Sequence, residues 1–187
     1  INNINLYFTF FIIISYNYFN SIIQKKMSIL NIIKFPNTYL NKKSKNIDTI
    51  NDTIKKITDD LIETMFHYDA LGIAATQVNI PKSLIIVNMS NNYTKQALTI
   101  INPKIIYKKY DSINEEGCLS FPNIFVKIKR HRDIFVSFFD INNKKHYLKC
   151  NRMLSICLQH EIDHLNGITI YDKVNNLKKK LILKNLK

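Results

Sequence analysis

Two histidines spaced four residues apart are the clearest chemical signal in the sequence, in the segment His160-Glu161-Ile162-Asp163-His164. On a helix, side chains four residues apart point to the same side, so both imidazoles can bind one metal ion. Glu161 follows the first histidine, where its carboxylate can reach a water molecule on that ion. The pattern predicts a metal site, although a pair of ordinary core or surface histidines stays open as the alternative.

A catalytic metal site also needs a third protein ligand and an open position for water. Downstream of His164 the chain has no histidine, cysteine or glutamate, and Asp172 is the only acid there. This argues against metallopeptidases that take their third ligand from beyond the motif, and it directs the search upstream. Cys118 stands in a glycine-containing segment that can present a thiolate to a metal.

The three cysteines, Cys118, Cys150 and Cys157, are too few and odd in number for a disulfide framework. We therefore expect a reducing compartment and at least one thiol that is free to bind metal. Cys150 and Cys157 are weaker ligand candidates, because each is best interpreted as a small buried hydrophobic residue. Cys157 precedes His160 by three residues, so it is also placed to line a pocket beside the metal.

Three segments, taken in order along the chain, carry a family resemblance. They are Gly72–Gln77 (GIAATQ), Glu116–Ser120 (EGCLS) and Gln159–His164 (QHEIDH). They resemble the three motifs of the peptide deformylase family, in its bacterial and organellar branch, and the similarity extends from about Met27 to the C-terminal helix. Three ordered motifs are far more specific than the histidine pair alone.

The resemblance implies a metal-dependent hydrolase with one divalent ion bound by Cys118, His160 and His164. Fe2+ is expected by analogy with the family, with Zn2+ or Ni2+ as substitutes. Such an ion lowers the pKa of water so that hydroxide is available near neutral pH. Glu161 would accept the proton of that water and later pass it to the leaving amine.

The resemblance also implies a substrate site. The Gln77 amide and the Leu119 backbone N–H would donate hydrogen bonds to the developing oxyanion, and Gly72 would let the substrate backbone approach closely. An apolar pocket would receive the methionine side chain. The other expected substrate-binding residues are Leu71, Gly117, Met153, Ile156 and Cys157.

The expected reaction is removal of the formyl group from the N-terminal formylmethionine of newly made proteins, with release of formate. Two alternatives are another HExxH metallopeptidase and a non-enzymatic basic protein that binds RNA or membrane. The expected partners are formylated nascent chains near the ribosome, with no specific nucleic acid and no stable membrane span. We expect a monomer in a bacterial-type cytoplasm, or in an organelle of bacterial origin.

The formal net charge of +13 invites a nucleic-acid interpretation. Only three of the 27 basic residues are arginines (Arg130, Arg132 and Arg152), and the abundance of Ile, Asn, Lys, Tyr and Phe is typical of AT-rich codons. Nucleic-acid sites favour arginine for its planar fork of donors. We therefore predict a solvated basic surface rather than a specific nucleic-acid site.

Residues 1–26 are expected to be an N-terminal extension and residues 27–187 the catalytic domain. The first 24 residues carry no charge. A membrane anchor is disfavoured, because Asn17 and Asn20 interrupt an apolar run that is well short of about 20 residues. We expect a segment that is absent from the mature protein, because Met27 opens an ordinary domain start. An organelle-targeting segment is the second interpretation.

The element pattern predicts an α+β fold: mixed, mainly antiparallel β-sheets around a central helix that carries the HExxH motif, with N-terminal and C-terminal helices. Asp48 and Asp52 are candidate N-caps of a helix through about His67, and its apolar stripe is Ile54, Ile57, Leu61 and Met65. Residues 72–77 are expected as a loop or edge segment. Strands are predicted at 84–87, 98–101, 124–130, 134–139 and 146–150, a loop at 115–122, and helices at 152–165 and 174–187.

Two further expectations concern residues around the site. The direction of Asp163 does not suit a ligand, so we expect it to pair with Arg130 and help to orient the ligands. Ala70 stands where related enzymes often have glycine, and Phe125 where some have arginine near the pocket mouth. Phe125 is expected to alter preference beyond the first substrate residue.

Overall fold

The computed structural model describes residues 28–91 and 93–185, so the predicted extension at residues 1–26 lies outside the described residues. The described chain is α+β, as predicted. Its elements in order are η1 (Thr38–Asn41), α2 (Asp52–His67), β1 (Gly72–Ala74), η2 (Ala75–Val78), β2 (Leu84–Asn88), β3 (Ala97–Cys118), β4 (Phe121–Phe139), β5 (Lys145–Asn151), α3 (Arg152–Leu165) and α4 (Asn176–Asn185).

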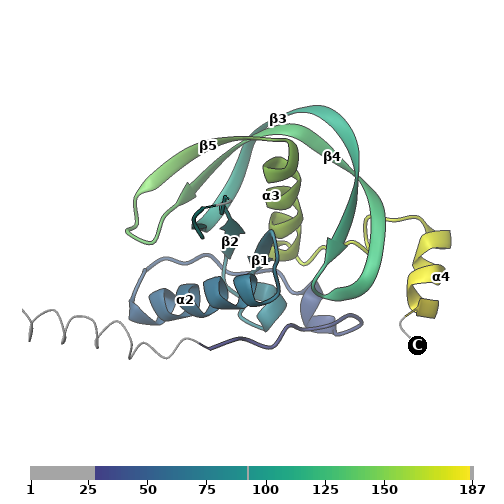
Figure 1. The fold of residues 1–187 in the computed structure, drawn as a ribbon, viewed down its shortest axis with the longest axis horizontal. Helices are drawn as coiled ribbons and strands as arrows, with labels where there is room; N and C mark the ends of the chain where they lie inside the picture. The colour runs from purple at the N-terminus through teal and green to yellow at the C-terminus, as the bar shows by residue number, and fades with distance from the viewer. Residues whose placement is uncertain (1–27, 92, 186–187) are drawn as a thin grey trace, which may run out of the picture.

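The strands form one antiparallel sheet in the order β1-β2-β3-β4-β5. In Figure 1 the long β3–β4 hairpin and β5 arch over one end of α3, and the closed end of the hairpin descends beside that helix. Helix α2 lies across the base of the molecule. The sheet therefore wraps around α3, which is the central helix that the sequence predicted.

Strand β2 is buried on both faces, which explains its unbroken apolar sequence. Leu84 and Ile86 belong to the core that contains Leu61 and Met65 of α2. Ile85 and Val87 point the opposite way, into the core that contains Leu158 and Leu165 of α3. Because successive strand side chains alternate between faces, a single five-residue strand packs both helices against the sheet.

Helix α2 begins at one of the two candidate caps, Asp52, and four residues after the other, Asp48. Its N-cap is Asn51, whose side chain accepts a hydrogen bond from the Ile54 N–H, so the predicted caps Asp48 and Asp52 are wrong. Asp52 is instead the first helical residue, where its charge favours the positive end of the helix dipole. The predicted stripe is confirmed, with three of its members buried and Ile57 partly buried.

The predicted loop at residues 115–122 is wrong, because strand pairing continues almost to its centre. Strand β3 runs to Cys118, and β4 begins at Phe121, which pairs with Cys118. The two strands predicted at 124–130 and 134–139 are both parts of β4. Three register shifts along β3 interrupt the alternation of apolar and polar residues by which a strand is read from sequence.

Helix α3 has the predicted bounds: it ends at Leu165 and is followed by Asn166, its C-cap, and Gly167. Gly167 adopts a φ of +72°, and a Cβ there would lie 2.3 Å from the Asn41 backbone oxygen. Glycine is therefore required both by the backbone conformation and by the close approach of η1.

Helix α4 begins at Asn176, two residues later than predicted. The Asn175 side chain accepts a hydrogen bond from the Lys178 N–H, so the helix starts after Val174. Residues 186–187 lie outside the described residues.

Across residues 28–91 and 93–185, no helix has both the length and the apolar character needed to span a membrane.

Candidate active site

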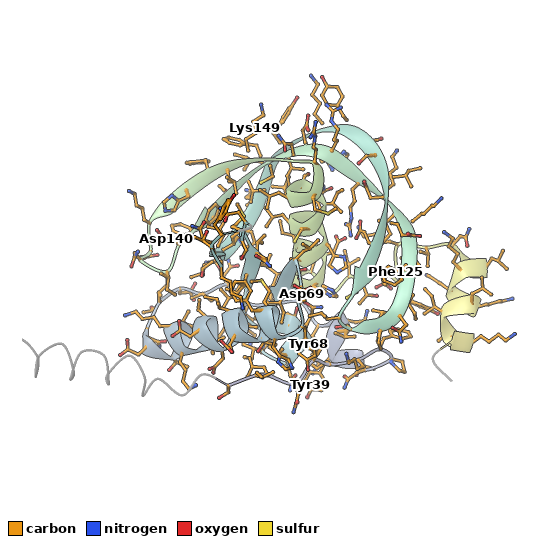
Figure 2. The ribbon with its side chains drawn as sticks, viewed as in Figure 1. Tyr39, Tyr68, Asp69, Phe125, Asp140 and Lys149 are labelled. Atoms are coloured by element: carbon orange, nitrogen blue, oxygen red, sulfur yellow. The ribbon has the colours of Figure 1, made fainter. Side chains whose placement is uncertain are left out.

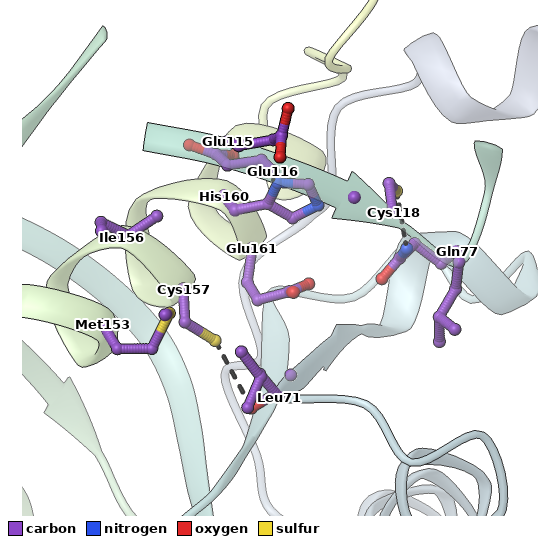
Figure 3. Close-up of a pocket in the computed structure, with 13 residues that line it drawn as sticks. Leu71, Gln77, Glu115, Glu116, Cys118, Met153, Ile156, Cys157, His160 and Glu161 are labelled. Atoms are coloured by element: carbon purple, nitrogen blue, oxygen red, sulfur yellow. Dashed lines mark hydrogen bonds and ion pairs between the residues drawn. The ribbon is translucent and has the colours of Figure 1, made fainter. Parts of the chain in front are cut away.

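Helix α3 supplies most of the polar side chains of the site from one buried face. Cys157, His160, Glu161 and His164 are all buried, and their spacings of three and four residues place them on the same side of the helix. Figure 3 shows Cys157 and Glu161 projecting from α3 toward Leu71, with His160 near the end of β3. The sequence prediction of a helix-borne pair of histidines is therefore confirmed.

The end of β3 brings Cys118 to this face. The Cys118 Sγ lies 3.2 Å from the His164 Nε2, and the possible ligand atoms of Cys118, His160 and His164 all lie within 4.8 Å of one another. The two imidazole rings are 4.9 Å apart and nearly perpendicular. One sulfur and two ring nitrogens thus converge on one point, although the residues come from segments about 40 positions apart in sequence.

Glu116 holds His160 in the orientation that a ligand needs. Its Oε2 lies 2.9 Å from the His160 Nδ1, which leaves the other ring nitrogen directed toward the site. Ligating histidines commonly use their second nitrogen in this way. No role for Glu116 followed from the sequence alone, where its signal was that of an acid two residues before a candidate thiolate ligand, within a motif.

Arg130 connects the strands to α3 through a buried ion network. Its Nε and Nη2 donate to both oxygens of Glu116, at 2.7 and 2.9 Å, and its Nη1 donates to Asp163. Lys173 adds a second cation 3.1 Å from Asp163. The predicted pairing of Asp163 with Arg130 is confirmed, and it orients the site through Glu116.

The electrostatics of the site differ between its two histidines. Burial, followed by the charges of His160 and Arg130, holds the pKa of His164 well below its usual range, so this imidazole is neutral and able to bind a cation. Burial opposes the charged form of His160, but hydrogen bonds with Cys118 and Glu116 outweigh it and raise its pKa. His160 would release its proton on binding a cation. The convergence of a thiol and two imidazoles within 4.8 Å fits one divalent ion.

Glu161 is a buried carboxyl beside the candidate ligands. Desolvation raises its pKa to about 7, which is the range in which a group can both accept and donate a proton near neutral pH. Its Oε2 is buried and has no hydrogen-bond partner among the described residues. This atom is available to a water molecule or a substrate.

Gln77 has a fixed orientation in which its donor faces the site. Its Oε1 accepts a hydrogen bond from the Ala74 N–H at 2.9 Å, so the amide NH2 points away from β1. That nitrogen lies 3.6 Å from the Cys118 Sγ and 3.4 Å from the Ser120 Oγ. The short turn of η2, directly after β1, places a hydrogen-bond donor next to the thiol.

A cavity of about 190 Å³ opens onto these groups (Figure 3). Cys118, His160 and Glu161 line it, as do all of the sequence-predicted substrate residues; His164 is not among the lining residues. The predicted set that lines it is Leu71, Gly72, Gln77, Gly117, Leu119, Met153, Ile156 and Cys157.

Two glycines of the motifs are packed tightly around this cavity. A Cβ on Gly72 would lie 2.8 Å from the Cys157 Sγ and 3.0 Å from the Glu161 Oε1. A Cβ on Gly117 would lie 2.8 Å from the ring of Phe125, which is itself 69% exposed. Phe125 therefore covers the Gly117 backbone outside the cavity, and it is not among the lining residues.

The chain matches the sequence profile of polypeptide deformylases over residues 29–180. It belongs to the polypeptide deformylase family. Members of this metal-dependent family remove N-formyl groups from nascent polypeptides, so the expected reaction is confirmed at the level of the family. Neither of the alternative functions is favoured.

Individual relatives agree in sequence and in fold. The chain is 40% identical to a peptide deformylase of Thermodesulfovibrio yellowstonii, over 86% of this chain and 98% of that protein. It is 42% identical to one of Buchnera aphidicola, over 84% of this chain and 91% of that protein. The crystal structure of the Ehrlichia chaffeensis peptide deformylase in complex with actinonin superposes with a TM-score of 0.81 at 34% identity, over 86% of this chain and 97% of that one.

The ion network generates a prediction about stability. Arg130→Met leaves Glu116 and Asp163 buried without their shared cation, and breaking a buried ion pair in this way costs about 3–5 kcal/mol. Arg130 is only 4% exposed. We expect the free energy of unfolding, measured by urea denaturation, to fall by that amount.

Arg132→Met is the matched control. It removes the same side chain at an exposed ion pair with Asp133, and such pairs contribute little to stability. If both variants lower the free energy of unfolding equally, the Arg130 network does not stabilise the fold as described.

Proposed function

We propose that this chain hydrolyses the formamide bond of N-formylmethionyl polypeptides with Glu161 as acid and base, Gln77 and Leu119 as oxyanion donors, and Cys118, His160 and His164 as ligands of one divalent ion. The observation that carries the proposal is the position of Glu161. Its buried carboxyl lines the same cavity as Cys118, His160 and Gln77.

The ligand set suits Fe2+, and Zn2+ or Ni2+ as substitutes, because one thiolate and two imidazoles bind each of these borderline cations. When bound, the ion supplies Lewis-acid chemistry that lowers the pKa of water and polarises a carbonyl oxygen. Glu116 pairs with the Nδ1 of His160, so that the other ring nitrogen of His160 is left for the ion. The network of Arg130 holds that glutamate in turn.

Glu161 moves the proton of the reaction. Its carboxylate accepts a proton from the attacking water, whose oxygen forms a bond to the formyl carbon. It then donates that proton to the methionine nitrogen as the carbon–nitrogen bond breaks. The products are formate and a polypeptide with a free amino terminus, and Glu161 returns to its initial state.

Gln77 and Leu119 stabilise the charge that develops on the formyl oxygen. The Gln77 amide is held by Ala74, so its NH2 need not reorganise during the reaction. The Leu119 backbone follows the ligand Cys118 directly and lines the same cavity. The Leu119 N–H therefore donates beside the NH2 group of Gln77.

The cavity explains the substrate that we propose. Gly72 has no side chain, and any Cβ there would meet Glu161 and Cys157, so the substrate backbone can pass close to β1. The methionine side chain contacts the apolar lining formed by Leu71, Met153 and Ile156. A formyl group fits beside Glu161, whereas an acetyl group adds a methyl.

We further propose that the protein works as a monomer near the ribosome, where formylated nascent chains are available. The compartment is a bacterial-type cytoplasm, or an organelle of bacterial origin if residues 1–26 form a targeting segment. The similarity to bacterial enzymes supports this proposal.

Purification without oxygen tests the reaction and the metal on one sample. We expect formate release from formyl-Met-Ala-Ser, together with about one equivalent of iron by elemental analysis. Anaerobic handling is required because a ferrous site with a thiolate ligand is sensitive to oxidation. Cleavage within the peptide would contradict the proposed function, and zinc or nickel in an active sample would contradict only the proposed metal.

Glu161→Gln is expected to lower kcat by about 10²–10⁴ while the metal content stays unchanged, because the proton acceptor is lost but the three ligands remain. Glu115→Gln is the matched control, since Glu115 also lines the cavity but is exposed. Retained turnover in Glu161→Gln would remove Glu161 from the reaction.

Gln77→Glu keeps the oxygen that accepts the Ala74 N–H and removes the NH2 donor. Loss of one oxyanion donor lowers kcat by about 10²–10³, and we expect at least this effect with little change in KM. Steady-state formate release measures both parameters. A change confined to KM would show that Gln77 binds substrate in its ground state only.

A further inference from the structure

The outer face of the sheet, away from α3, carries a cluster of exposed aromatic side chains. Tyr107 on β3 is directly opposite Phe135 on β4, which is opposite Lys149 on β5. Tyr147 stacks on Phe135, with ring centroids 6.1 Å apart. Tyr107, Tyr110 and Tyr147 are each more than half exposed. Flat rings thus lie side by side on three neighbouring strands.

These rings border a hollow of about 420 Å³, lined by Tyr107, Lys109, Tyr110, Asp133, Ile134, Phe135 and Lys149. A second, adjoining hollow is lined by Arg132, Asp133, Lys149, Asn151 and Arg152. In Figure 2 Lys149 lies at the outer edge of the molecule, over the strands and away from α3. The surface is open to solvent in the structure and lies apart from the cavity of the candidate active site.

The exposed arginines of the chain lie together on this face. The chain has three arginines among 27 basic residues; one is the buried Arg130, and the other two, Arg132 and Arg152, both line this region. Arg132 also stacks over the Tyr110 ring at 4.6 Å, and Lys109 lies 4.5 Å from the same ring. The low arginine count argued against a nucleic-acid site, but the exposed arginines are gathered on one face.

The charge of the two hollows is strongly positive. Their lining includes four cations (Lys109, Arg132, Lys149 and Arg152) and one acid, Asp133. Asp133 is paired with Arg132 at 3.2 Å, so it balances one of those charges. The remaining three are free to attract phosphate groups that flank the aromatic surface.

We propose that this outer face of β3, β4 and β5 binds single-stranded RNA. Bases would stack on the exposed tyrosines, a sequence-tolerant interaction because every base has a π face, and the lysines and arginines would contact the backbone phosphates. A hollow bordered by rings fits a flat base. A lipid surface would instead favour apolar side chains that project outward, whereas the acid Asp133 lies in this hollow.

Fluorescence anisotropy with a labelled twelve-nucleotide RNA of mixed sequence tests the proposal on the full chain. Tyr107→Ala should weaken binding about five-fold or more, since loss of one stacked base partner has an effect of that order. Lys149→Glu should weaken binding and reduce the salt dependence by about one phosphate contact. Formate release should stay unchanged in both variants, which shows that they are folded.

Two matched controls come from another part of the surface. Tyr39 is an exposed aromatic residue in another part of the surface, with Lys42 3.6 Å from its ring centroid, so Tyr39→Ala removes a tyrosine ring outside this face. Lys43→Glu changes the net charge as Lys149→Glu does, at an exposed position outside this face. Neither control should alter RNA affinity beyond about two-fold.

The proposal is overturned if Tyr107→Ala binds like the unmodified protein and Lys149→Glu is no weaker than Lys43→Glu, since binding is then due to net charge alone. It is also overturned if anionic phosphatidylserine vesicles bind and RNA does not, with the same sensitivity to the variants. Because formate release is measured separately, failure of RNA binding leaves the proposed deformylase function standing.

Discussion

The buried guanidinium of Arg130 is the interaction on which the site depends. It lies on β4, contacts Glu116 on β3 and Asp163 on α3, and through Glu116 it fixes the ring of His160. A buried cation with two carboxylates is stable only when all partners are in place. The network therefore sets how β3 and β4 lie against α3, and this placement brings Cys118 beside His164.

Packing around β2 provides the frame in which this network forms. Strand β2 packs with one face in the core of α2 and with the other face in the core of α3. Strand β1 pairs with β2, so β1 and the η2 turn that follows it are held against α3. Gly72 and Gln77 reach the cavity for this reason. The tight contact between Gly72 and Glu161 shows how closely the backbone of β1 approaches the groups that line the cavity.

Burial has opposite effects on neighbouring groups in the site. It keeps His164 neutral and raises the pKa of Glu161 to about 7, whereas hydrogen bonds to Cys118 and Glu116 raise the pKa of His160. Buried polar atoms that have no partner among residues 28–91 and 93–185, such as Glu161 Oε2, reduce stability. A protein retains such atoms where function requires them.

The sequence by itself predicted a metal-dependent hydrolase that resembles the polypeptide deformylases, because its three motifs and the spacing of His160 and His164 are read from neighbouring residues. It also predicted α2 and α3 from their apolar periodicity, which is read from neighbouring residues, although the N-cap of α2 is Asn51 and neither of the predicted aspartates. The tertiary structure alone decided the long β3–β4 hairpin, since register shifts and polar residues hide those strands in the sequence. It alone revealed Glu116 as the partner of His160, and it gathered Arg132 and Arg152 on one face, because only folding brings distant residues together.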